Sequence, residues 1–350
     1  MNSEERVLTA FRFQRPDKIP VMGDFWSFPP EWEARFGDPG LLTDTRLYVP
    51  VEGAFSLNAR LLKEEGGWNY TRDNWGRLVR NRGDAYFSET MESPLEGSVD
   101  LKSVVFDSPF LDSRYLKSMT QEQFETYIMK EKKQWALFIK TGGPYLRTSF
   151  MRGEAQFLMD MAGEPDLARE LAEKVSEHIT AVGVEALRRS KLYQTGIWIY
   201  DDMSFNHGPM FSPKTFEHVF LPAYRKMVKT YHAAGAKYVM FHSDGDIRPL
   251  LDMLVDAGID GINPVERRAG MLMPELRKKY RKLILTGGMC NSDTLINGPI
   301  SKIEAEAREI IDLGRNGGVV IGTHSLSPEV PIENFAAYLN ICRTYGVFQK

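Results

Sequence analysis

The sequence predicts a (β/α)8 barrel, or TIM barrel, with an N-terminal insertion rich in aromatic residues. Strands of about five residues alternate with helices of about 10–20 residues over residues 196–350, which is the pattern of parallel β/α units. The predicted strands are apolar throughout, as is typical of strands covered on both faces. The chain has 350 residues, enough for eight such units with insertions.

The second half of the chain supplies five of the predicted strands, each followed by a predicted helix. The strands are expected at residues 196–200, 237–241, 259–264, 282–286 and 318–322, and the helices at 213–232, 247–257, 273–281, 300–313 and 332–345. Ser212 and Pro213 favour the start of the first helix, because serine caps helix N-termini and proline fits the first helical position.

The first half supplies the other three strands, expected at residues 18–22, near 47–51 and at 144–150. A β-hairpin is expected as an insertion over the barrel mouth at about residues 66–90. No linker-like segment divides the chain, so residues 1–350 are expected to form one domain. A doubly wound open sheet is the competing architecture, but the sequence has no G-x-G-x-x-G motif after its first strand.

Composition and charge argue against several classes of protein. The 44 Lys and Arg residues nearly balance the 47 Asp and Glu residues, so we expect no nucleic-acid partner and no membrane partner. No apolar run approaches the roughly 18 residues of a membrane span, and the N-terminus lacks the apolar core of a signal peptide. The two cysteines provide no disulfide framework. We therefore expect a cytoplasmic protein, and the sequence leaves open whether it forms a homodimer.

Polar residues follow the predicted strands, at the edge where active sites lie in parallel β/α folds. They are Asp201, Asp202, His242, Asp244, Asp246, Asn263, Glu266, Cys290 and His324. Asn263, Glu266 and Cys290 are candidate substrate contacts, together with Trp26 from the aromatic first quarter of the chain. The alternative for Cys290 is that it packs as a small apolar side chain. The alternative for the aromatic residues is that they form the hydrophobic core of the insertion.

His242 and Asp244 form the sharpest local pattern, because residues two apart in an extended or turn segment can face one point. His324, which follows the last strand, would approach the same cavity from across the barrel. Two histidines and a carboxylate make a three-ligand site for a divalent metal with an open position. The alternative is structural: Asp244 accepts a hydrogen bond from His242 or caps the next helix.

Asp201 and Asp202 are adjacent carboxylates at a strand end. Like charges this close disfavour simultaneous ionisation, so one of them could keep a raised pKa and act as an acid or base. The alternative is that one faces the cavity while the other caps a turn.

Several segments carry a family resemblance in the same order along the chain. They are Gly208-Pro-Met-Phe-Ser-Pro213, His242-Ser-Asp-Gly-Asp-Ile247, Ala257-Gly-Ile-Asp-Gly-Ile-Asn-Pro264, Gly287-Gly-Met-Cys-Asn-Ser-Asp-Thr-Leu295 and His324-Ser-Leu-Ser-Pro-Glu-Val-Pro331. This pattern resembles the uroporphyrinogen decarboxylase superfamily over about residues 140–350. The resemblance implies a (β/α)8 barrel with one of two activities: metal-free decarboxylation of a tetrapyrrole, or methyl transfer between a corrinoid and a thiol that zinc activates.

The decarboxylase branch fits the resemblance less well. Its arginine-rich early motif corresponds to residues 22–31, which contain no arginine but do contain Asp24 and Glu31. These carboxylates would repel an octa-anionic substrate, which needs charge-assisted partners. Phe150 stands where that branch has its catalytic tyrosine, although His324 matches its strand-end histidine.

The methyltransferase branch fits better, with changes in the ligands. His242 keeps that branch's histidine, while Asp244 and His324 replace its two cysteines. The implied N,O,N set still suits zinc or another divalent metal, and it leaves the metal a stronger Lewis acid. We therefore expect a metal-dependent methyltransferase that uses a corrinoid protein and a small-molecule acceptor such as a thiol.

In that enzyme, Asp201 with Asp202 would orient substrate or handle its proton, and Asp246 or Asn263 would hold a histidine tautomer. Two alternatives remain at this stage. One is a lyase that acts on a smaller acid, with Asp201 and His324 as proton donors. The other is a non-catalytic barrel that binds a corrinoid or tetrapyrrole.

Overall fold

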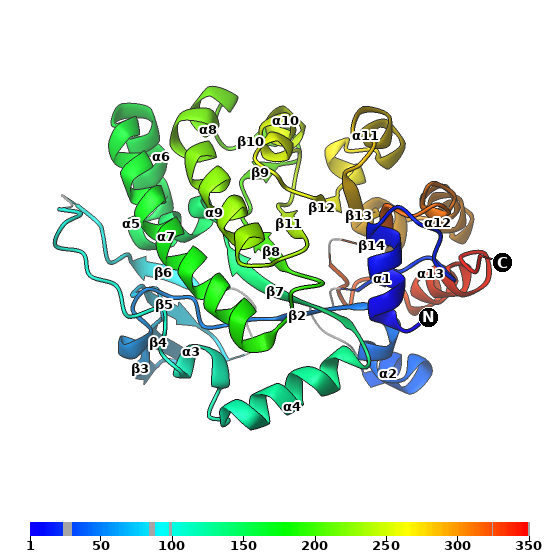
Figure 1. Ribbon diagram of the computed structural model, residues 1–350, viewed down its shortest axis with the longest axis horizontal. Helices are drawn as coiled ribbons and strands as arrows, with labels where there is room; N and C mark the ends of the chain where they lie inside the picture. Colours follow the sequence, from blue (N-terminus) through cyan, green and yellow to red (C-terminus); the bar gives the residue numbers. More distant parts are fainter. Residues whose placement is uncertain (24–29, 84–87, 98–99, 324, 349–350) are drawn as a thin grey trace.

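The computed structural model describes residues 1–23, 30–83, 88–97, 100–323 and 325–348. Eight parallel strands form one sheet that curls into a barrel, with helices packed around its outside (Figure 1). The strand order is β1-β14-β13-β12-β11-β8-β7-β2, so each strand from β7 onward lies beside the barrel strand that follows it in the chain. The predicted (β/α)8 barrel is confirmed.

The barrel strands and the surrounding helices have the following bounds. The strands are β1 (Val21–Met22), β2 (Thr45–Tyr48), β7 (Ala136–Gly142), β8 (Ile197–Tyr200), β11 (Val239–His242), β12 (Gly261–Val265), β13 (Ile284–Met289) and β14 (Val319–Thr323). The helices of the first half are α1 (Ser3–Phe11), α2 (Pro30–Phe36), α3 (Ser113–Leu116), α4 (Gln121–Lys132), α5 (Pro144–Arg152), α6 (Glu154–Gly163) and α7 (Pro165–Ser190). Those of the second half are α8 (Pro213–Val219), α9 (Leu221–Ala233), α10 (Arg248–Asp256), α11 (Met273–Lys279), α12 (Ile300–Gly314) and α13 (Ile332–Thr344).

The third predicted strand was placed one element too late. Residues 144–150 belong to helix α5, and the strand is β7, a run in which all side chains but one are buried. Pro144 occupies the first turn of α5, where a missing backbone N–H costs no hydrogen bond. The apolar residues after Pro144 therefore form one face of a helix rather than a strand.

The predicted helix over residues 213–232 is divided into two helices. Helix α8 ends at Val219 and α9 begins at Leu221, with Phe220 between them. Pro222 lies in the first turn of α9 and has no N–H to donate to the preceding turn. The apolar periodicity continues across this break, so it did not reveal the division.

The insertion contains four antiparallel strands rather than the two of a hairpin. They are β3 (Arg60–Glu65), β4 (Trp68–Arg72), β5 (Leu78–Asn81) and β6 (Glu89–Glu92), paired in chain order. Trp75, in the turn between β4 and β5, is buried. The Arg77 guanidinium lies 3.7 Å from the ring centroid of Phe150 in α5, which joins the sheet to the barrel.

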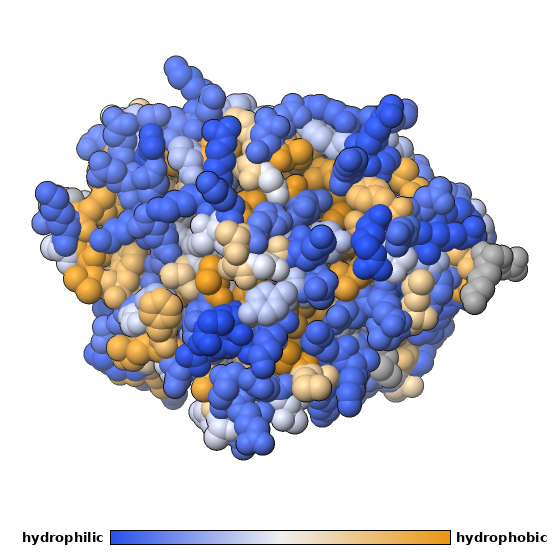
Figure 2. Space-filling model, viewed as in Figure 1, coloured by the Kyte–Doolittle hydropathy of each residue, from blue (hydrophilic) through white to orange (hydrophobic). Residues whose placement is uncertain are grey.

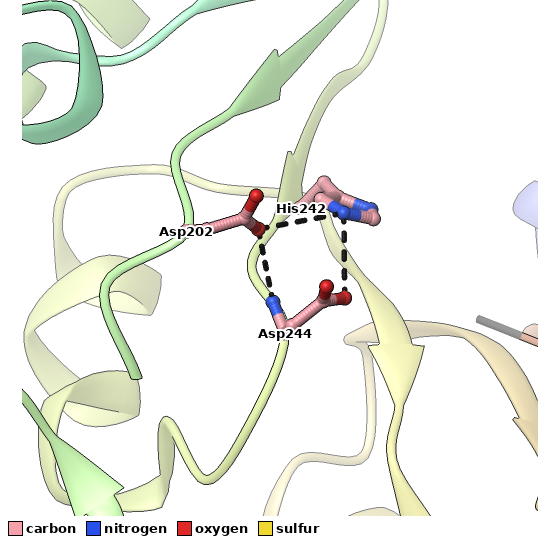
Figure 3. A group of neighbouring side chains, drawn as sticks. All are labelled: Asp202, His242 and Asp244. Atoms are coloured by element: carbon pink, nitrogen blue, oxygen red, sulfur yellow. Dashed lines mark hydrogen bonds and ion pairs between the residues drawn. The ribbon is translucent and has the colours of Figure 1, made fainter. Parts of the chain in front are cut away.

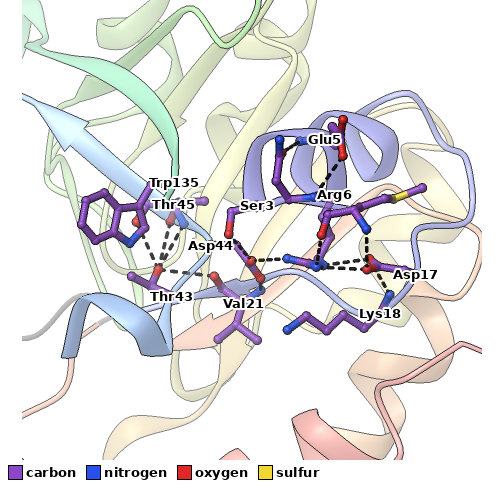
Figure 4. Close-up of polar contacts among 12 residues, drawn as sticks. Ser3, Glu5, Arg6, Asp17, Lys18, Val21, Thr43, Asp44, Thr45 and Trp135 are labelled. Carbon is purple, nitrogen blue, oxygen red and sulfur yellow. Dashed lines mark hydrogen bonds and ion pairs between the residues drawn. The ribbon is translucent and has the colours of Figure 1, made fainter. Parts of the chain in front are cut away.

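The seam between the first two barrel strands is closed by Asp44, the residue before β2 (Figure 4). Its backbone N–H donates to the carbonyl of Val21 in β1 over 2.7 Å, and its carboxylate accepts from the N–H of Val21 over 2.9 Å. The same carboxylate accepts from Arg6 Nη1 over 2.6 Å and from Ser3 Oγ over 2.8 Å, both in α1. Asp44 therefore links β1, β2 and α1.

The barrel interior is packed with side chains, so it is a core and not a pore. Phe138, Trp198, Met240, Ile284 and Val320 fill it from five different strands. Nearer the carboxyl ends of the strands, polar residues replace these apolar ones. This change in the interior places the candidate site at the barrel mouth.

Figure 2 shows hydrophobic side chains interspersed among hydrophilic ones on the face in view. Among the described residues, none of the helices has the length and apolar character that crossing a lipid bilayer requires.

His178 in α7 predicts a pH dependence of stability. Burial, with the nearby Arg114 guanidinium, lowers its pKa to about 4, and Nε2 lies 3.0 Å from the carbonyl oxygen of Glu52. In the unfolded chain a histidine titrates near 6.5, so as the pH falls the unfolded state takes up a proton first. The stability present at neutral pH should therefore fall by about 3 kcal/mol between roughly pH 6.5 and pH 4.

The variant His178→Gln keeps a donor for Glu52 and removes the titration. The free energy of unfolding is measured for both proteins by urea denaturation at about pH 7, 5 and 4. Between pH 7 and pH 4 it should fall by about 3 kcal/mol more in the wild type than in the variant. A difference between the two proteins that stays constant across this range would contradict the prediction.

Candidate metal centre

Three side chains with metal-binding atoms meet at the carboxyl ends of two adjacent strands (Figure 3). His242 is the last residue of β11, and Asp244 follows it by two positions. Asp202 follows the end of β8, which pairs with β11 so that Tyr200 lies opposite His242. The ligand atoms of Asp202, His242 and Asp244 all lie within 4.8 Å of one another.

The imidazole nitrogen and the two carboxylates form a compact triangle. His242 Nε2 is 3.6 Å from Asp202 Oδ1 and 3.6 Å from Asp244 Oδ1. The backbone N–H of Asp244 donates to Asp202 Oδ1 over 3.1 Å, which ties the two loops together. His242 is buried, whereas both carboxylates are partly exposed, so the group is open toward solvent on one side.

Gly245 makes the turn that brings Asp244 back toward His242. Its φ is +80°, and a Cβ at this position would lie 2.6 Å from the carbonyl oxygens of Ser204 and Phe205. Both the left-handed conformation and the close approach favour glycine. The N–H of Gly245 donates to Glu266 Oε2 over 2.7 Å, so Glu266 supports this loop.

The orientation of the His242 ring is set by Asn263 in β12. His242 Nδ1 lies 2.6 Å from Asn263 Oδ1, and the amide nitrogen of Asn263 donates to the sulfur of Met22 over 3.4 Å. With the amide oxygen facing the ring, Nδ1–H donates, and Nε2 is the ring nitrogen left to bind a cation. Nε2 faces Asp202 and Asp244.

This donor set fits a divalent cation. A neutral imidazole and two carboxylates are ligands that zinc and other first-row divalent metals accept. Two carboxylates this close repel each other, and a cation between them would relieve that repulsion. His242 together with Asp202 and Asp244 would therefore hold the metal, and the exposed side would stay open.

The structure places Asp202 beside two of the three ligands that the sequence predicted. His242 and Asp244 lie together as the pattern indicated, and Asp202 joins them although the sequence assigned it to acid–base chemistry. His324, the expected third ligand and candidate catalytic residue, lies outside the described residues. Trp26, the expected aromatic substrate contact, lies outside them as well.

Asp201 lies in a different environment from its neighbour, as one of the two alternatives anticipated. It is fully buried, and its carboxylate accepts from the backbone N–H groups of Tyr145 and Leu146 over 3.0 and 2.6 Å. The Tyr224 hydroxyl donates to the same carboxylate. These bonds cap the N-terminus of α5, and both oxygens are occupied, so this geometry is that of a structural cap rather than a substrate contact.

The electrostatics of Asp201 follow from the same environment. Burial raises the pKa of its carboxyl to about 6, although the Tyr224 hydroxyl and the two N–H groups favour the ionised form. The prediction that one of the two adjacent carboxylates keeps a raised pKa therefore applies to the buried one, which does not face His242.

Two other candidates at strand ends, Cys290 and Asp246, make hydrogen bonds to residues close to them in the chain. Cys290 is 5% exposed, and its sulfur accepts from the N–H of Asp293 over 3.4 Å. Asp246 forms an ion pair with Arg248 and accepts from its backbone N–H, the first of α10, over 3.0 Å, so Asp246 rather than Asp244 contacts the start of that helix. Among the described residues, Asn263 is therefore the one that contacts the Nδ1 edge of His242.

Tyr200 and Lys140 were not among the site residues predicted from the sequence. The Tyr200 ring stacks on His242 with 4.0 Å between ring centroids and 16° between planes, and the Lys140 ammonium lies 3.9 Å from the Tyr200 ring centroid. The sequence indicates Tyr200 only as an ordinary member of an apolar strand, and Lys140 falls outside the predicted strands. The signal that could have found them is register, because Tyr200 and His242 end neighbouring strands.

The fold and the strand-end motifs identify the class of protein. The uroporphyrinogen decarboxylase (URO-D) family matches residues 120–345, which run from α4 through α13. The match covers more than half of the chain, and the chain belongs to this family. It includes all three residues of the candidate metal centre, and it confirms the resemblance predicted from the sequence.

Individual proteins similar to this chain include methyltransferases. Two proteins named methylcobamide:CoM methyltransferase MtaA, from Methanosarcina barkeri strain Fusaro / DSM 804 and from Methanosarcina barkeri, are 28% and 27% identical to this chain over 128 residues. The aligned segment spans 37% of this chain and 36% of each relative. A solved structure of a methyltransferase from Methanosarcina mazei covers 99% of both chains with a TM-score of 0.67 and 17% identity, and so shares the fold. These comparisons fit the methyltransferase branch of the family.

Proposed function

We propose that this protein is a metal-dependent methyltransferase that moves a methyl group between a corrinoid, carried by a partner protein, and a small acceptor such as a thiol. The observation that carries the proposal is the convergence of Asp202, His242 and Asp244 at the barrel mouth. The similarity to methylcobamide:CoM methyltransferases supports methyl transfer rather than another reaction at such a site.

The residues of the site have different roles in the proposed reaction. Asp202, His242 and Asp244 would hold zinc or another divalent cation, which when bound lowers the pKa of an acceptor thiol so that it ionises near neutral pH. The partly exposed carboxylates leave room for the acceptor to approach, while buried Asn263 keeps Nε2 of His242 directed at the site. The acceptor thiolate would then attack the methyl carbon that the partner's corrinoid carries. A carbon–sulfur bond would form as the cobalt–carbon bond breaks, and the electron pair of the broken bond would stay on cobalt.

The oxygen-rich donor set has a consequence for the identity of the metal. Thiolate ligands select soft cations, whereas carboxylates and imidazole accept harder divalent metals as well. This site should therefore be less selective for zinc than a site with cysteine ligands, and Mn²⁺ or Co²⁺ should replace zinc in it.

The test combines metal content with methyl transfer. The protein is purified without added metal and its metal content is measured by mass spectrometry. Methylcobalamin is then mixed with a series of small thiols, and loss of the cobalt–methyl absorbance is followed before and after chelation. We expect a stoichiometric metal, turnover with at least one thiol, loss of turnover after chelation, and recovery when Zn²⁺, Co²⁺ or Mn²⁺ is added back.

Three outcomes would contradict the proposal. One is folded protein that contains no metal and gains none on titration. Another is turnover that chelation leaves unchanged. A third is quenching of tryptophan fluorescence by methylcobalamin with no turnover under any metal, which would favour a non-catalytic binding barrel.

A further inference from the structure

Three inward-facing residues form a row across neighbouring strands at the barrel mouth. Tyr200 in β8 lies opposite His242 in β11, and His242 lies opposite Asn263 in β12. All three are buried, with exposed fractions of 7%, 6% and 2%. The side chains of such a row lie side by side, because residues in register point to the same face of a sheet.

The His242 ring is restrained by contacts of two kinds. Tyr200 covers one face of the ring as a stacked aromatic partner, at 4.0 Å between centroids. Asn263 Oδ1 accepts from Nδ1 at the edge of the ring, over 2.6 Å. The first contact fixes the plane of the imidazole, and the second fixes its rotation within that plane. Together they leave Nε2 facing Asp202 and Asp244.

Tyr200 and Asn263 each make a further contact on the side away from His242. The Lys140 ammonium and the His242 ring both approach the centre of the Tyr200 ring to about 4 Å. Two groups this close cannot share one face, so Lys140 covers the face away from His242. This agrees with the strand order, in which β7 and β11 lie on either side of β8. On the other side of the row, Met22 in β1 accepts from the amide nitrogen of Asn263.

We propose that Tyr200 and Asn263 are positioning residues that hold His242 as its Nδ1–H tautomer, with Nε2 directed at Asp202 and Asp244. Neither residue supplies a ligand atom to the three-residue group. Their effect on metal affinity rests on the proposed function, whereas their effect on the histidine tautomer does not.

The first experiment reads the tautomer directly. The ring nitrogens of His242 are observed by ¹⁵N NMR in histidine-labelled protein, and their signals are assigned by their loss in His242→Ala. Measured at alkaline pH, where the ring is neutral, the wild type should show a protonated Nδ1 and an unprotonated Nε2. In Asn263→Ala and Tyr200→Leu the two nitrogen signals should move toward each other, as the second tautomer becomes populated. Tyr200→Phe, which keeps the stacked ring, should retain the wild-type signals.

A matched control separates positioning from a general loss of packing. Phe138→Leu removes another buried aromatic ring from the barrel interior, one that packs on Trp198 at 5.2 Å between centroids. It should lower thermal stability and leave the His242 signals unchanged. If Tyr200→Leu fails to fold, Asn263→Ala and Tyr200→Phe still give the comparison.

The second experiment is a titration with Co²⁺, followed by its visible absorption. Loss of residues that orient a metal-binding histidine typically weakens affinity by roughly 10–100-fold, and we expect that range for Tyr200→Leu and Asn263→Ala. Tyr200→Phe should stay within about threefold of the wild type, because the stack remains.

The two experiments separate this inference from the proposed function. If wild-type protein binds no Co²⁺ while the variants change the tautomer, the proposed function fails and the positioning role stands. If Tyr200→Leu and Asn263→Ala leave the His242 signals as Phe138→Leu does, the positioning role is overturned, whatever the metal titration shows.

Discussion

Replacing His242 with alanine is expected to remove the bound metal and to lower kcat/KM for methyl transfer by roughly a thousandfold. His242 provides the nitrogen donor of the group, and its Nε2 lies 3.6 Å from both carboxylates. Without it, two partly exposed carboxylates are left to hold a cation in competition with water. A metal that activates a nucleophile contributes several kcal/mol to the transition state, and each 1.36 kcal/mol corresponds to a factor of ten in rate. Metal content and steady-state kinetics of the purified variant are the measurements.

The carboxylate variants test which ligand set is correct. Asp244→Ala should lose metal under either set, since Asp244 belongs to both. Asp202→Ala should lose metal only if the group seen in the structure is the binding site, because the set predicted from sequence used His324 in its place. His218→Ala is the matched control, since His218 is a partly exposed histidine that pairs with Asp166 on the surface. Full metal content in His242→Ala would refute the assignment of the site.

The sequence predicts the site only in part, because local spacing pairs some of its residues whereas tertiary packing places the others. His242 and Asp244 could be paired from sequence alone, because a spacing of two residues is local geometry. Asp201 and Asp202 could not be told apart, since the N-terminus of α5 that captures Asp201 lies more than fifty positions earlier in the chain. Which carboxylate faces the cavity is therefore decided by tertiary packing. The roles of Tyr200 and Asn263 depend on strand register, which one sequence does not reveal.

The fold was easier to predict where strands are marked by apolar runs between glycine-rich or polar turns. Strands β8, β11, β12, β13 and β14 all lie within a few residues of their predicted positions. The error at residues 144–150 arose because a short apolar run fits a buried strand and a buried helix equally well. Pro144 was the local signal for a helix start, and the strand β7 lies just before it, beginning with the four apolar residues 136–139.

Replacing Asp44 with alanine is expected to destabilise the barrel by roughly 3 kcal/mol, the lower end of the cost of removing one partner of a buried ion pair, because Arg6 keeps its second partner Asp17. Asp44 and Arg6 both have side chains only 8% exposed, and their charged atoms lie 2.6 Å apart. The substitution also leaves the N–H of Val21 and the hydroxyl of Ser3 without the acceptor that the wild type provides. Since the affected residues belong to α1, β1 and β2, the loss falls on the seam that closes the barrel.

Urea denaturation followed by circular dichroism measures the free energy of unfolding of this variant. Asp252→Ala is the matched control, because Asp252 is 65% exposed and pairs with exposed Lys279 at 2.8 Å. A surface pair of that kind typically contributes no more than about 1 kcal/mol. Equal losses in the two variants would show that the Asp44 carboxylate is not what holds the seam. In that case the backbone bond from the N–H of Asp44 to the carbonyl of Val21, which alanine retains, would be sufficient to close the barrel.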